Sequence, residues 1–112
     1  MLGWELPPHF VGGMGVVCDQ LTKYLANSGA DIEFVLPFSA NYSGIKHMKV
    51  RSALDQDAKS LMASGSTYDS MKYTLIRKDG TKVTRSLQEQ VEAFASNISG
   101  IVKYGEYDVI HA

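Results

Sequence analysis

The order of apolar and polar positions divides the first third of the chain into three elements. Met1–Glu5 is a short apolar run typical of a buried strand. Met14–Asn27 repeats apolar side chains at helical spacing, and Ile32–Leu36 is a second apolar run that ends at Pro37. Strand, helix and strand in this order predict a right-handed β-α-β unit with parallel strands. The helix face expected to be buried carries Met14, Val17, Cys18, Leu21 and Leu25.

The first helix has a clear end, and the stretch that follows it is less strongly patterned. Gly29, which closes the run Asn27-Ser28-Gly29, suits the left-handed position just after a helix. Between residues 38 and 70, the run Asn41-Tyr42-Ser43-Gly44 is typical of a turn. A short helix is predicted later in this stretch from the spacing of Leu54, Ala58, Leu61 and Met62.

A hairpin and a long helix are predicted next. Lys72–Arg77 and Thr81–Arg85 flank Asp79-Gly80, the two-residue signature of a tight β-hairpin. Ser86-Leu87-Gln88-Glu89 has the form of a capping box, in which Ser86 and Glu89 each bond the other's backbone N–H. The helix that follows ends at Gly105. Its apolar face carries Leu87, Val91, Phe94, Ala95, Ile98, Ile101 and Val102.

The last residues complete the predicted fold class. Tyr107–His111 has the composition of a third parallel strand, which is normally buried on both faces and followed by a further helix. We therefore expect an α/β fold: a partial doubly wound, Rossmann-like parallel sheet of at least three strands with a small inserted β-hairpin. Residues 1–112 would be the amino-terminal portion of a larger domain. An unpaired edge at this third strand would favour a homo-oligomer.

Composition and charge exclude several classes of protein. The formal net charge is −1 and the charged residues are interleaved, so nucleic acid and membrane surfaces are not expected as partners. Cys18 is the only cysteine, which rules out an internal disulfide and suits the reducing cytoplasm. The apolar runs are too short to span a membrane, and the start does not resemble a signal peptide. Three scattered histidines predict no metal site, and no cofactor is expected.

The most informative chemistry lies where the first strand meets the first helix. The run Gly12-Gly13-Met14-Gly15 can bring bare backbone N–H groups and the positive end of a helix dipole to an anion. This favours a phosphate-bearing ligand. It does not match the dinucleotide pattern Gly-x-Gly-x-x-Gly, because residue 18 is a cysteine. The alternative interpretation is a tight strand-to-helix connection with no ligand.

Two separated segments resemble one enzyme family. The opening Trp-Glu-Leu-Pro-Pro-His-Phe-Val-Gly-Gly-Met-Gly, with the helix and strand that follow, is similar to the start of retaining glycosyltransferases with two Rossmann-like domains, such as glycogen and starch synthases. The closing Tyr-Asp-Val-Ile-His-Ala is similar to a later strand of the same enzymes. The resemblance covers residues 1–37 and 105–112. It implies an amino-terminal, acceptor-side domain of the GT-B type.

The resemblance also implies roles for individual residues. Gly12 and Gly13 would let the backbone approach the donor diphosphate, with the Met14 amide at the start of the helix. Those synthases place a lysine where this chain has Phe10, which favours their broader relatives. His111 matches the first histidine of a His-x-His pattern, and no catalytic role is assigned to it. The catalytic histidine and the donor-binding domain of these enzymes would lie beyond the residues given.

Other polar and aromatic residues have a functional and a structural interpretation. Glu5 and His9 are candidates for contacts with the acceptor, although Glu5 would pair locally and His9 would be polar surface in the alternative. Asp55 and Asp57 are expected on a solvated face. Cys18 is expected in the core. Trp4 and Tyr42 can stack on sugars, but packing is the commoner role.

The predicted function is therefore hexose transfer by the parent enzyme. The donor would be a nucleotide-diphosphate sugar of the ADP- or UDP-glucose type, and the acceptor a glycan or another sugar. The 112-residue chain alone is expected to be inactive. The alternative is a non-enzymatic, flavodoxin-like or Rossmann-like module that binds a phosphate or mononucleotide. A purely structural assembly domain is the third hypothesis.

Overall fold

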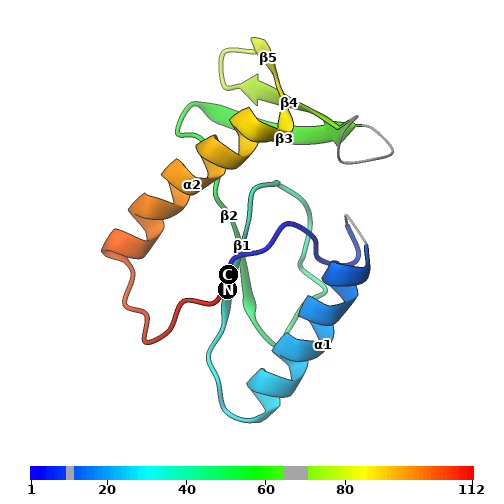
Figure 1. Ribbon diagram of the computed structural model, residues 1–112, viewed down its shortest axis with the longest axis vertical. Coiled ribbons are helices and arrows are strands. Elements are labelled where there is room, and N and C mark those ends of the chain that lie inside the picture. The colour runs from blue at the N-terminus through cyan, green and yellow to red at the C-terminus, as the bar shows by residue number, and fades with distance from the viewer. Residues whose placement is uncertain (10–11, 65–70) are drawn as a thin grey trace. The chain divides into compact units, whose positions relative to one another are not determined.

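A computed structural model describes residues 1–9, 12–64 and 71–112. The chain divides into two compact units, one formed by Met1–Ser52 with Asp108–Ala112 and the other by Ala53–Tyr107 (Figure 1). The described residues form two helices, a two-stranded parallel sheet and a three-stranded antiparallel sheet. The predicted α/β class is confirmed, and the arrangement is compatible with a partial Rossmann-like fold.

The parallel sheet of the first unit contains the predicted second strand and one strand that the sequence did not predict. Strand β1 (Glu33–Leu36) pairs in parallel with β2 (Lys49–Ser52). On its other side β1 forms a single parallel bridge, between Val35 and Leu2. The segment predicted as the first strand therefore runs parallel to β1 as expected, but it makes one bridge rather than a continuous strand. Its position beside β1 helps to bury β1, as expected for a parallel strand.

Helix α1 (Gly13–Asn27) is confirmed, but the predicted buried face is partly wrong. Met14 and Val17 are 68% and 58% exposed, whereas the fully packed side of the helix carries Gly15 and Thr22. The Thr22 hydroxyl donates to the carbonyl oxygens of Cys18 and Asp19, at 2.9 and 3.0 Å. A hydroxyl that donates to carbonyl oxygens of its own helix can be buried at low cost. The pattern of hydrophobic residues alone therefore predicts the wrong buried face of α1.

The core of the first unit is built from segments far apart in the sequence. Leu6, Phe34 and Leu36 are fully buried, and Tyr42 packs with them. Cys18 is half-buried against this cluster, in agreement with its expected place in the core. Gly29, just after α1, has φ +99°, the left-handed conformation predicted for it.

The first strand of the second unit lies where the sequence predicts a helix. The short helix predicted through Leu54, Ala58, Leu61 and Met62 is wrong, because Ala58–Ser64 forms strand β3. This strand pairs antiparallel with β4 (Lys72–Arg77), and buried Leu61 lies opposite buried Leu75. The cross-strand partner decides the conformation of this segment, and the partner cannot be read from local spacing.

The predicted hairpin is confirmed, with a connection one residue longer than expected. Strand β4 pairs antiparallel with β5 (Lys82–Arg85). The Arg77 N–H donates to the Thr81 carbonyl oxygen, and the Gly80 N–H donates to the Arg77 carbonyl oxygen. Gly80 has φ +89°, so the loop is a turn closed by a left-handed glycine. The Arg77–Thr81 hydrogen bond encloses three loop residues, 78–80, and a three-residue loop is a common alternative to the two-residue turn.

Helix α2 (Leu87–Tyr104) begins with the predicted capping box. The Glu89 N–H donates to the Ser86 hydroxyl at 3.3 Å, and the Ser86 N–H donates to the Glu89 carboxylate at 3.4 Å. Phe94 is buried as expected, whereas Val91 is 46% exposed and Gln90 is buried in its place. The helix packs against β4 and β5 of its own unit.

The capping box gives a first testable expectation. Replacing Ser86 with alanine should lower the free energy of unfolding by about 1 kcal/mol, because it removes the acceptor for the Glu89 N–H. Ser96, which is exposed within the same helix, provides the matched control, and Ser96→Ala should leave stability unchanged or slightly increase it. Chemical denaturation followed by circular dichroism measures both. Equal midpoints for the two variants would contradict the capping role.

The third strand predicted at Tyr107–His111 is wrong, since these residues form no strand in the structure. This segment makes one backbone hydrogen bond to the first segment of the chain, from the Leu2 N–H to the His111 carbonyl oxygen at 2.8 Å. The two ends of the chain accordingly lie side by side (Figure 1). Val109 and Ile110 are 79% and 51% exposed, so the apolar pattern that suggested a strand is not buried here.

Candidate functional site

The candidate site is the start of α1 and the segment that leads into it, both in the first unit. We call Gly12–Gly15 the glycine bend. Before it, the chain turns at Leu6–His9, where a cis peptide bond joins Pro7 to Pro8 and the His9 N–H donates to the Leu6 carbonyl oxygen at 3.1 Å. Phe10, the position at which the synthases that this chain resembles have a lysine, lies outside the described residues.

Backbone N–H groups are available at the start of α1. Gly12 is the N-cap residue and has an extended backbone, and the Val16 N–H donates to its carbonyl oxygen at 3.2 Å. Among the described residues, no acceptor pairs with the N–H groups of Gly13 and Met14. Met14 is 68% exposed. These two amides, at the positive end of the helix dipole, have the chemistry that an anionic ligand requires.

The three glycines of the bend have different surroundings. A Cβ atom placed on Gly12 would lie 2.5 and 2.8 Å from the two carboxylate oxygens of Glu5. One placed on Gly15 would lie 3.1 Å from the Glu5 Cβ, whereas one placed on Gly13 would meet nothing within 4 Å. A side chain at position 12 would therefore displace the Glu5 carboxylate, and one at position 15 would press on the Glu5 Cβ. The space beside Gly13 is open.

Glu5 contacts the glycine bend, which fits the alternative interpretation in which this side chain pairs within the chain. Its Oε2 accepts a hydrogen bond from the Gly15 N–H at 3.2 Å. Burial raises the pKa of the nearby Cys18 thiol, and the negative charge of Glu5 raises it further. A carboxylate has about four acceptor positions, so contact with Gly15 does not prevent contact with a sugar hydroxyl. No sequence motif marks this pairing, although the glycine at position 15 is consistent with it.

His9 is held by two contacts with the turn at residues 41–44. Its Nε2 lies 2.9 Å from the Asn41 carbonyl oxygen, and because a carbonyl only accepts, this nitrogen carries the proton. The His9 ring also packs edge-on against Tyr42, with ring centroids 5.3 Å apart. The structure thus brings Glu5, His9 and the glycine bend into one unit, and it fixes the orientation of the His9 ring.

The aromatic candidates have packing roles. The rings of Trp4 and Phe38 meet edge to face with centroids 5.6 Å apart. Tyr42 is 9% exposed, and burial raises the pKa of its phenol. His47 has its Nε2 2.9 Å from the Thr22 hydroxyl, and because the hydroxyl gives its proton to its own helix, this nitrogen donates to it. The rings of Trp4 and Tyr42 and the imidazole of His47 therefore have partners within the first unit.

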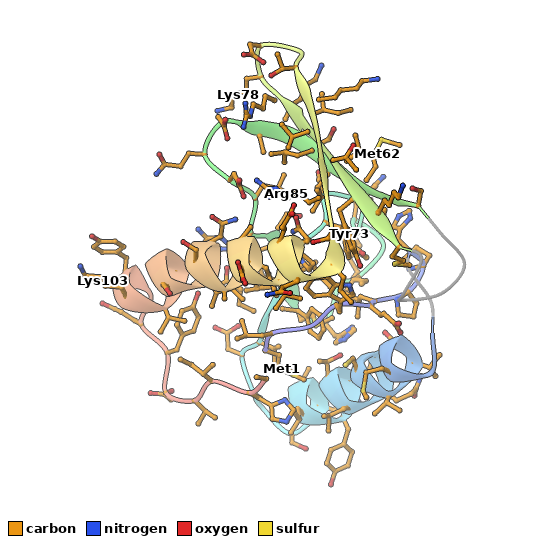
Figure 2. The ribbon with its side chains drawn as sticks, turned by 45° about the horizontal axis from the view of Figure 1, so that its top comes forward. Met1, Met62, Tyr73, Lys78, Arg85 and Lys103 are labelled. Atoms are coloured by element: carbon orange, nitrogen blue, oxygen red, sulfur yellow. The ribbon has the colours of Figure 1, made fainter. Side chains whose placement is uncertain are left out.

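Asp55 is not on a solvated face, and that prediction is corrected. In the second unit, Asp55 pairs with Arg85 and accepts from the Asn97 Nδ2 at 2.8 Å. Arg85 also donates to buried Gln90 at 3.2 Å, and Figure 2 shows the arginine beside the first turns of α2. The hydrogen bond from Arg85 lowers the pKa of Asp55. Of the two aspartates, Asp57 is the exposed one, and its carboxylate lies 3.1 Å from the Arg77 side chain.

The described residues contain neither a group of metal-ligating side chains nor a helix that could span a membrane. No group of three or more histidine, cysteine, aspartate or glutamate side chains is placed to hold a metal ion in the described ranges. Neither described helix is both long and apolar enough to cross a membrane. The candidate chemistry of the first unit is that of the backbone amides at the start of α1, with the Glu5 carboxylate against the glycine bend.

Comparison with known protein families gives a match that extends over the whole chain. The model of the family described as "Starch synthase catalytic domain" matches residues 1–112. The match includes the middle of the chain, which the resemblance of the two ends left uncovered. No curated protein and no solved structure matches the chain significantly.

Proposed function

Because this chain belongs to the family of starch synthase catalytic domains, we propose that it forms the acceptor-side, amino-terminal part of a retaining glycosyltransferase with two Rossmann-like domains. The family is one of glycosyltransferases of the glycogen and starch synthase type. In the proposed enzyme, a second domain binds most of the nucleotide-sugar, and this chain contributes the glycine bend. The single cysteine agrees with a place in the reducing cytoplasm.

The proposed reaction moves a hexose from a nucleotide-diphosphate sugar, of the ADP- or UDP-glucose type, to a glycan or another sugar acceptor. The bond from the anomeric carbon to the diphosphate oxygen breaks, and the diphosphate leaves with the electron pair. An acceptor hydroxyl oxygen forms the new bond to that carbon, and its proton passes to the departing diphosphate. Negative charge grows on the departing diphosphate, so preorganised N–H groups beside it lower the barrier. The proposal requires no metal and no cofactor.

The observation that carries this proposal is the open N-terminus of α1. The Gly13 and Met14 amides have no partner among the described residues, and the space beside Gly13 is clear. We assign the approach to the diphosphate to the backbone of Gly12, Gly13 and Met14. Glu5 and His9, whose side chains lie before the bend in the same unit, are assigned to the acceptor.

Gly13→Val in the two-domain enzyme tests the assignment. Its Cβ meets nothing within 4 Å in the chain, so the variant should fold with an unchanged thermal midpoint. The branched side chain would occupy the space that the donor needs, and donor affinity should fall about tenfold or more. Gly100→Val is the control, because it also adds a side chain in open space, but on α2 in the second unit. Calorimetric titration with ADP-glucose and UDP-glucose, together with release of nucleoside diphosphate, gives both readouts.

The outcomes separate the hypotheses. Unchanged donor affinity in Gly13→Val would overturn the placement of the diphosphate at the bend. Hexose transfer by the purified 112-residue chain would overturn the proposed division of labour between two domains. Micromolar binding of nucleotide by that chain alone would favour the non-enzymatic module instead.

Self-association is a separate part of the proposal, and its site would be the exposed apolar residues just before His111 rather than a strand edge. The apolar side chains of Val109 and Ile110 are exposed beside the segment that bonds Leu2. Burying such side chains against a second copy would be favourable. Sedimentation velocity over a range of concentrations tests this, and a monomer at the highest concentration would overturn it.

A further inference from the structure

The first turn of α1 has no cap of its own. Its N-cap residue is Gly12, which makes no side-chain hydrogen bond, and the first turn contains no acidic residue. Helices normally satisfy their first N–H groups with a side-chain oxygen at the N-cap or with a carboxylate in the first turn. The local sequence of α1 supplies neither.

Glu5 supplies the missing acceptor from ten residues earlier in the chain. Its Oε2 accepts from the N–H of Gly15, the third residue of the helix, which is the group that an N-cap side chain usually bonds. Both carboxylate oxygens lie so close to Gly12 that a Cβ there would collide with them. The carboxylate thus lies against Gly12 and bonds the Gly15 N–H. A side chain at Gly12 would displace the carboxylate, and one at Gly15 would press on the Glu5 Cβ.

We propose that Glu5 is a positioning residue: its carboxylate caps α1 and fixes the shape of the glycine bend, which leaves the Gly13 and Met14 amides to the ligand. The glycines then have separate tasks. Gly12 and Gly15 make room for Glu5, and Gly13 makes room for the donor. The capping role stands on the geometry alone, whereas its effect on the donor rests on the proposed function.

The cap can be tested without any ligand. Hydrogen exchange at the Gly15 amide, followed by NMR, should be about tenfold faster in Glu5→Ala, because its hydrogen bond to a charged acceptor is lost. Glu5→Gln keeps a carbonyl oxygen at the same place and should recover much of the protection. Asp19→Asn is the matched control, since Asp19 is a carboxylate on the same helix that pairs with Lys23. Unchanged exchange in Glu5→Ala would overturn the proposal.

The charge of Glu5 has its own readout at Cys18. This thiol is the only one in the chain, so its rate of alkylation against pH reports on a single site. Glu5→Gln removes the negative charge and should shift that profile to lower pH. An unchanged profile would overturn the placement of an ionised Glu5 beside the helix.

The effect on the donor is measured in the two-domain enzyme. Glu5→Ala should raise the KM for the nucleotide-sugar about tenfold, because the bend loses its fixed shape, and Glu5→Gln should restore most of it. A role limited to the acceptor would raise only the acceptor KM. If Gly15 exchange accelerates while the donor KM stays constant, the cap is upheld and its link to the donor is overturned.

Discussion

Gly3→Ala is expected to destabilise the protein by about 1–3 kcal/mol, because the new methyl group would overlap a ring in the core. Its Cβ would lie 2.4 Å from Cζ and 2.5 Å from Cε1 of Phe34. Phe34 is fully buried, so its ring has little room to move. The Gly3 N–H donates to the Val35 carbonyl oxygen at 3.0 Å, which holds the backbone in place as well. Denaturant unfolding followed by fluorescence measures the loss.

Two further variants make this result specific. Gly44→Ala adds a methyl group where nothing lies within 4 Å, and it should change stability by no more than about 0.5 kcal/mol. Phe34→Leu introduced together with Gly3→Ala should relieve the overlap, so the double variant should be more stable than the sum of the single changes predicts. Wild-type stability in Gly3→Ala, or strict additivity in the double variant, would contradict the contact.

Asp55→Ala should cost about 2–3 kcal/mol, because it breaks the polar network that joins residues 53–55 to β5 and α2 within the second unit. Asp55 is the shared acceptor of Arg85 and Asn97, and its loss leaves both donors without it. The two side chains of the ion pair are only 14% and 26% exposed, so water replaces the partner poorly. Asp57→Ala is the matched control. Its carboxylate is 60% exposed, and its loss should cost less than about 1 kcal/mol.

The same network predicts a dependence on pH. The hydrogen bond from Arg85 lowers the pKa of Asp55 in the folded state below its value in the unfolded chain, which is about 3.9. Its contribution to stability is therefore fully present above about pH 4 and is lost as the pH falls through the folded-state pKa. The difference in unfolding free energy between the wild type and Asp55→Asn should shrink in acid. A constant difference between pH 7 and about pH 2 would contradict the pairing.

The sequence predicted best those elements whose signals are local. Helix α1, helix α2 with the Ser86–Glu89 capping box, and the hairpin around Gly80 were all placed correctly, because caps and turns depend on neighbouring residues. Strand β3 was mistaken for a helix. Its burial depends on β4, a partner that residue spacing does not reveal. Tyr107–His111 has the composition of a buried strand, but in the structure it makes a single backbone bond to Leu2.

The candidate site divides in the same way. The pattern of residues along the chain locates the glycine bend and the start of α1. It also carries the resemblance to the family that the whole-chain match shows. The contact from Glu5 to Gly15 could not, since ten residues separate the two and no motif joins them. Nor could the bond from His9 to the Asn41 carbonyl oxygen, which spans 32 residues.

By itself, the sequence determined the α/β class, the two helices with their boundaries, the hairpin and the family. Each of these follows from the periodicity of apolar residues, from capping residues or from a motif along the chain. Only the tertiary structure decided which glycine faces open space, which carboxylate caps α1 and which aspartate is held in a network. Those properties depend on how closely atoms from distant segments approach, and a hydrogen bond or an overlap is settled within a fraction of an ångström.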